Sequence, residues 1–142
     1  MSTSEKKTFQ LHVPSTLGCE KVAMDFAASV AKSLNFPADR VEDLKTAVAE
    51  ACLNAIEHGN KLDANMKVGI SLTVDKGRLH IAVQDAGGGV GAVPAPDMQS
   101  QIEGKTEPGG WGIFLIKSLM DEVTFEATPE GNVVKMIIHL EK

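Results

Sequence analysis

The stretch EACLNAIEHGN, residues 50–60, is the most informative part of this sequence for the fold. On a helix of about 3.6 residues per turn, residues four apart lie one above another, which places Glu50, Asn54 and His58 in one row. Apolar residues of the same segment form a separate stripe beside this row: Val41, Leu44, Val48, Cys52 and Ala55. The pattern predicts a helix whose buried face is bordered by a row of polar side chains.

Hydrophobic periodicity assigns the remaining elements of the chain. It predicts a strand at 9–14, helices at 16–34, 40–58 and 111–120, a hairpin of strands 66–74 and 78–85, and two final strands at 122–128 and 132–140. This order predicts an α/β fold, an α+β sandwich with helices on one face of a mixed, mainly antiparallel sheet. We expect residues 1–142 to form one domain, since a chain of this length suffices for one core.

Local sequence also predicts how the central helix begins and ends. Asp39 follows a break in the helical pattern and is of a type that caps helix starts, so we expect it to cap this helix. At the other end, Gly59–Asn60 is predicted to supply a left-handed stop.

Composition narrows the functional classes. A hydrophobic content of 43% and a charged content of 23% are ordinary for a soluble globular protein. The net charge of −5 argues against nucleic acid or an anionic membrane as the main partner. We expect a cytoplasmic protein, because the sequence has no apolar signal core and no membrane-spanning run. Cys19 and Cys52 each fall inside a predicted helix, so we expect reduced packing residues rather than a disulfide.

A long aperiodic stretch covers residues 86–110, and the glycine-rich segment QDAGGGVGA, residues 84–92, leads into it. A dinucleotide-binding fingerprint is excluded there, because Pro94 and Pro96 stand where its helix would begin. Asp85 ends an apolar strand and would lie at the floor of any cleft that the stretch encloses. A carboxylate in that place can accept a hydrogen bond from the exocyclic amine of a purine.

The same stretch ends with a second glycine segment, PGGWGIFLIKSL, in which Gly109, Gly110 and Gly112 lead into an apolar helix. Bare amides at the positive end of a helix dipole bind phosphate, although simple glycine capping would give the same pattern. The polar row likewise fits either a partly solvated helix face or a site in which Asn54 binds Mg²⁺ and Glu50 orients a hydroxyl or water. Taken together, the segments predict a nucleotide site closed by residues 86–110 as a lid.

Across essentially its whole length, the chain resembles the GHKL ATPases, whose shared ATP site is the Bergerat fold. Within them it is most similar to the small bacterial anti-sigma factor serine/threonine-protein kinases. The N box matches EACLNAIEHGN, the first glycine box DAGGGV and the second GGWGIFLIKSLMDEV, in the family's order and spacing.

The resemblance implies ATP and Mg²⁺ as cofactors. It makes Asn54 the metal ligand, Glu50 the catalytic base and Asp85 the adenine contact. Further nucleotide contacts are expected from the three boxes, at His58, Gly87, Gly89, Val90, Gly109, Gly110, Trp111, Gly112 and Ile113. The sequence departs from the family at Asn132, where a threonine usually supports the adenine site, and at Trp111, which is bulkier than the usual residue.

The implied function is that of an anti-sigma regulatory factor. It would phosphorylate a serine or threonine of an anti-sigma factor antagonist and sequester a sigma factor when the antagonist is phosphorylated. The expected partners are the antagonist and the sigma factor, and a homodimer is compatible with this function. Two alternatives stay open: a non-catalytic ATP-gated binding switch, and the ATP-binding domain of a histidine kinase. The latter also needs a helical dimerisation domain, and only a few residues precede the first predicted strand.

Overall fold

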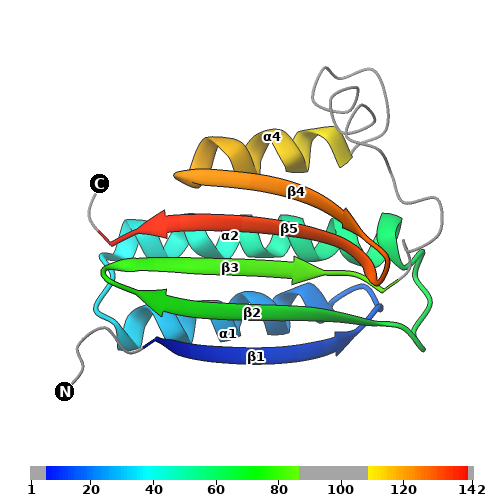
Figure 1. Cartoon of the computed structure of the whole chain (residues 1–142), viewed down its shortest axis with the longest axis horizontal. Helices are drawn as coiled ribbons and strands as arrows, with labels where there is room; N and C mark the ends of the chain where they lie inside the picture. Colours follow the sequence, from blue (N-terminus) through cyan, green and yellow to red (C-terminus); the bar gives the residue numbers. More distant parts are fainter. Residues whose placement is uncertain (1–5, 87–108, 141–142) are drawn as a thin grey trace.

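The computed structural model describes residues 6–86 and 109–140 (Figure 1). Its sheet has five strands in the order β1-β2-β3-β5-β4, and every neighbouring pair is antiparallel. The strands are β1 (Lys7–Pro14), β2 (Lys67–Asp75), β3 (Arg78–Gln84), β4 (Glu122–Thr128) and β5 (Gly131–His139). The expected strands are all present, and the sheet among the described residues is antiparallel throughout rather than mixed.

The helices are α1 (Cys19–Ser33), α2 (Ala38–Asn54) and α4 (Gly109–Leu119), with a π-helical turn η1 (Ala55–Gly59) that continues α2. Helices α1 and α2 lie against one face of the sheet, and α4 packs beside α2 (Figure 1). This arrangement confirms the predicted sandwich. No helix within residues 6–86 and 109–140 is both long and apolar enough to cross a membrane.

The core forms where the inward side chains of the sheet meet the apolar stripes of α1 and α2. Alternation along the strands sends every second residue inward, and the apolar stripe predicted on α2 is buried there. Its main members are Val68, Ile70, Leu72, Leu79, Ile81, Met136 and Ile138 from the sheet, with Ala27, Leu44, Val48 and Cys52 from the helices. Cys19 and Cys52 are free thiols, as expected, and burial raises the pKa of Cys52 to about 12, so this thiol stays neutral in the core.

The predicted bounds of the central helix hold to within two residues, but both predicted capping assignments are wrong. Pro37 occupies the N-cap position, and Asp39 lies in the first turn, where its Oδ1 accepts a hydrogen bond from the Arg40 amide. At the other end, Asn60 has a φ of −97°, and the left-handed residues are Lys61 and Leu62. The reason is the wider η1 turn, which carries the chain past Gly59 before it reverses.

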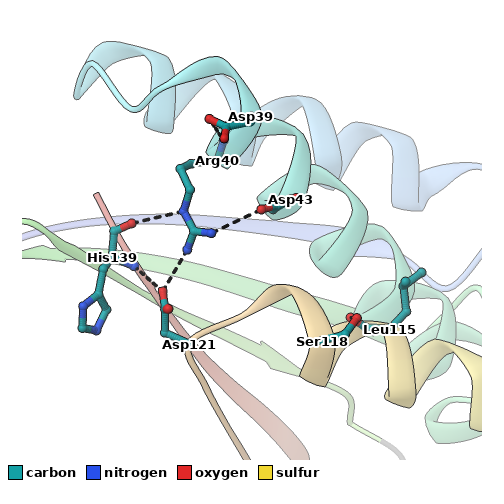
Figure 2. A network of polar contacts seen from close by, with 7 residues as sticks. All are labelled: Asp39, Arg40, Asp43, Leu115, Ser118, Asp121 and His139. Atoms are coloured by element: carbon teal, nitrogen blue, oxygen red, sulfur yellow. Dashed lines mark hydrogen bonds and ion pairs between the residues drawn. The ribbon is translucent and has the colours of Figure 1, made fainter. Parts of the chain in front are cut away.

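A buried arginine ties three elements together at the end of α2 that is remote from residues 50–60 (Figure 2). Arg40 is 3% exposed, and its Nη2 donates to Asp121 Oδ2 at 2.9 Å. Its Nη1 donates to Asp43 at 3.2 Å, and its Nε to the His139 carbonyl at 3.4 Å. The same Asp121 oxygen accepts the His139 amide at 2.8 Å. The start of α2, the α4–β4 junction and the end of β5 are therefore held at one point.

Replacing Asp121 by alanine should lower the free energy of unfolding by about 1–3 kcal/mol, because a buried guanidinium and an amide lose their shared acceptor. Urea denaturation measures this loss. Asp43→Ala is the matched control: its carboxylate is equally exposed and bonds the same arginine, but within residues 6–86 and 109–140 it accepts no hydrogen bond from a backbone amide. Equal losses in the two variants would contradict a special role for Asp121.

Candidate functional site

A pocket lies between the C-terminal part of α2 and the inner face of the sheet. Five strands and helices contribute to its wall, together with the η1 turn. The lining residues are Ala51, Asn54, Ala55, His58, Gly59, Val83, Asp85, Ile113, Phe125, Glu126, Ala127, Asn132, Val133 and Val134. Most of the wall is apolar, and its few polar groups come from α2, η1 and the strand ends, as is usual for a small-molecule site.

Asp85 is a buried carboxylate in this pocket, 6% exposed, directly after β3. Its backbone amide donates to the Asn132 carbonyl at 3.0 Å, and its Oδ1 accepts the Asn132 amide at 3.0 Å. Two glycines make room for it. A Cβ atom at Gly59 would overlap the Asp85 side chain, and one at Gly131, where φ is 140°, would overlap the Asp85 carbonyl oxygen. Asp85 is therefore seated between η1 and the start of β5.

Glu50 and Asn54 lie against the first turns of α4. A Cβ atom added at Gly112 would stand 2.6 Å from Glu50 Oε1 and 3.7 Å from Asn54 Nδ2. Only a residue without a side chain allows this approach. Helical periodicity places Glu50 and Asn54 at the border of the buried stripe of α2. Because α4 packs beside α2, these two side chains lie next to it. Glu50 and Asn54 of the predicted polar row thus face the predicted glycine-led helix.

The structure brings several predicted site residues together. Asn54, His58, Asp85 and Ile113 line one pocket, and Glu50 lies beside it against Gly112. Gly109, Gly110 and Trp111 form the start of α4, for which only the backbone is described. The predictions for Gly87, Gly89 and Val90, and nearly all of the expected lid at 86–110, lie outside the described residues.

Sequence reasoning missed the wall that β4 contributes. Phe125 pairs with Val134 and Ala127 with Asn132, so their side chains share the inner face of the sheet. The alternation of EVTFEAT carried this signal. Asn60, which lies next to the site, was also missed, because the Gly-Asn pair indicates a helix stop and nothing more. It is 2% exposed, and its Oδ1 accepts the Ala86 amide at 2.8 Å.

The sequence is similar to those of two named bacterial proteins. It is 37% identical over 101 residues to the serine-protein kinase RsbW of Bacillus subtilis, an alignment that covers 68% of this chain and 63% of the relative. It is 30% identical over 127 residues to the anti-sigma F factor of Bacillus velezensis, covering 87% of this chain and 86% of the relative. The matched region thus spans just under two thirds of the RsbW protein's length.

Solved structures share the fold. The crystal structure of the RsbU and RsbW domains of a Mycobacterium tuberculosis protein superposes with a TM-score of 0.69 at 14% identity, over 94% of this chain and 32% of that one. The blue-light activated histidine kinase of Erythrobacter litoralis gives 0.59 at 18% identity, over 84% and 41%. The sequence of residues 13–138 matches the family model of the histidine kinase-like ATPase domain. With its fold, its three sequence boxes and this match in agreement, the chain belongs to the histidine kinase-like ATPase domain family.

Proposed function

We propose that this protein binds ATP with Mg²⁺ in the pocket and phosphorylates a serine or threonine of an anti-sigma factor antagonist. It sequesters a sigma factor when that antagonist is phosphorylated. The observation that carries the proposal is the approach of Glu50 and Asn54 to Gly112, beside a pocket floored by Asp85. Relatives named as a serine-protein kinase and as an anti-sigma factor support the choice of acceptor and partner.

Asp85 reads the base in this proposal. Its carboxylate is buried in the pocket wall, where it can accept a hydrogen bond from the 6-amino group of adenine. Charge-assisted hydrogen bonds in a desolvated site are about twice as strong as neutral ones. Guanine presents an oxygen at the same ring position, so a carboxylate there disfavours guanine.

The first turns of α4 hold the phosphates. Helix N-terminal amides point toward an anion, and the helix dipole favours negative charge there. Because Gly112 has no side chain, the side chains of Glu50 and Asn54 lie close to the first turns of α4. A Cβ atom at this position would stand 2.6 Å from Glu50 Oε1, so the Glu50 carboxylate would have to shift.

Asn54 would hold Mg²⁺. An amide oxygen is a suitable ligand for this cation, which usually takes only one or two protein ligands and completes its shell with water and phosphate oxygens. Asn54 lines the pocket beside α4, and its side-chain amide contains one neutral oxygen of the kind that this cation takes as a ligand. Bound Mg²⁺ supplies positive charge that offsets the charge of the phosphates.

Glu50 acts as the general base. The hydroxyl oxygen of the antagonist's serine or threonine forms a bond to the γ-phosphorus, and the bond from that phosphorus to the bridging oxygen breaks. ADP leaves with that oxygen, and the hydroxyl proton passes to the Glu50 carboxylate. General-base assistance contributes roughly 10²- to 10⁴-fold in rate. Glu50 adds little to ATP affinity, because its charge has the same sign as that of the phosphates.

Asn54→Ala should remove most of the Mg²⁺ dependence of ATP binding while the fold persists. Titration calorimetry in Mg²⁺ and in EDTA measures that dependence. Asn65→Ala, in an exposed turn between η1 and β2, is the control and should keep it. Equal ATP affinity of the unmutated protein in Mg²⁺ and in EDTA would show that the metal assignment is wrong.

Glu50→Gln keeps the shape of the side chain and removes the base, so transfer of labelled phosphate should slow by roughly 10²- to 10⁴-fold. ATP affinity should stay within a few-fold. Single-turnover assays with candidate antagonist proteins measure transfer, and Glu57→Gln, on the exposed side of η1, is the control. Transfer by Glu50→Gln at the unmutated rate would exclude this base. If the unmutated protein transfers phosphate to no antagonist, the ATP-gated switch replaces the kinase.

A further inference from the structure

Asn60 is a buried polar residue next to the site, and the proposed function gives it no role. It follows η1 and is 2% exposed. Its backbone amide donates to the Ala55 carbonyl at 2.8 Å, which closes the π-helical turn, and its carbonyl accepts the Asp63 amide at 3.0 Å. Both backbone groups of Asn60 therefore fix the end of the helix that carries Asn54.

The side chain of Asn60 uses both of its ends. Its Nδ2 donates to Ser15 Oγ at 2.8 Å and to the Lys67 carbonyl at 3.2 Å, and its Oδ1 accepts the Ala86 amide at 2.8 Å. Because the Lys67 carbonyl can only accept and the Ala86 amide can only donate, the orientation of the Asn60 amide is determined. One side chain thus joins the ends of β1 and β2 to the residue after Asp85.

These hydrogen bonds restrict the position of Asp85. The peptide group before it is held by β5, since the Asp85 amide donates to Asn132. The peptide group after it is held by Asn60, since the Ala86 amide belongs to that peptide. The position of the Asp85 Cα, and with it the carboxylate, is fixed from both sides. One of those two fixed points is a side chain anchored at the end of the metal-binding helix.

We propose that Asn60 is a positioning residue that determines adenine selectivity without touching the base. It holds Asp85 at a set separation from α2 and η1, so that the carboxylate meets the 6-amino group of a nucleotide whose phosphates lie at α4. This inference rests on the proposed function, because it needs Asp85 to read adenine. A purely structural role for Asn60 would leave selectivity unchanged.

The test compares two ligands that differ only at the 6-amino group: ATP and purine riboside 5′-triphosphate, which carries hydrogen there. Titration calorimetry on the unmutated protein should show a preference for ATP of roughly tenfold, the effect of one charge-assisted hydrogen bond. Asn60→Ala should weaken ATP binding several-fold to tenfold and analogue binding less than twofold. The preference should then fall toward one.

Two variants separate positioning from stability. Ser15→Ala removes a partner of Asn60 Nδ2 and leaves the Ala86 bond, so it should lower the melting temperature and keep the preference for ATP. Asn60→Asp loses the donors but keeps an acceptor for the Ala86 amide, and it should also keep the preference. If Asn60→Ala does not fold, Asn60→Ser takes its place. The serine side chain is one bond shorter than that of asparagine, so its oxygen does not reach the Ala86 amide.

A preference within twofold of the unmutated value in Asn60→Ala or Asn60→Ser would overturn the inference. Loss of the preference in Ser15→Ala would also overturn it, because the effect would then follow stability rather than the Ala86 bond. Failure of the proposed function looks different. In that case the unmutated protein itself binds the two ligands equally or binds neither, and Asn60 has no base-reading residue to position.

Discussion

The shape of the pocket depends on the close packing of Asp85 between η1 and β5. A buried carboxylate costs free energy unless it is hydrogen-bonded, and Asp85 accepts the Asn132 amide inside a wall that is mostly apolar. The backbone can approach this closely only because Gly59 and Gly131 have no side chains. Since Gly59 ends η1 and Gly131 begins β5, Asp85 sets the separation between helix layer and sheet there, through its side chain on one side and its backbone carbonyl on the other.

Helix α4 lies close to α2 near both of its ends. At one end Gly112 lies against Glu50, and just beyond the other end Asp121 receives the buried guanidinium of Arg40. Between them Ile113, Ile116 and Met120 are buried. A helix held this way has little freedom to slide, which suits a site whose groups must keep their geometry to within about half an ångström. The Arg40 cluster thus supports the pocket from the opposite end of α2.

Much of this arrangement could be predicted from the sequence because it follows local periodicity. The helical repeat predicted the side of α2 on which Glu50 and Asn54 lie, and alternation predicted the strands. The errors arose where contacts between distant segments decide the structure. The end of the helix depends on Asn60, whose partner Ser15 is 45 residues away, and the burial of Arg40 depends on Asp121, 81 residues away. No local pattern carries such pairings, and a Gly-Asn pair has the same appearance whether its asparagine is exposed or buried.

The charges around the pocket separate the two halves of the proposed nucleotide site. Among its described lining residues, Asp85 and Glu126 are acidic, none is lysine or arginine, and Glu50 adds a carboxylate beside Gly112. A negative wall suits adenine, which is neutral and offers an amino group, but it repels a triphosphate. Within the proposed function, the phosphates must therefore be held by backbone dipoles of α4 and by a cation on Asn54. Mg²⁺ is then needed for tight ATP binding as well as for chemistry, because the described part of the pocket has no lysine or arginine to replace it.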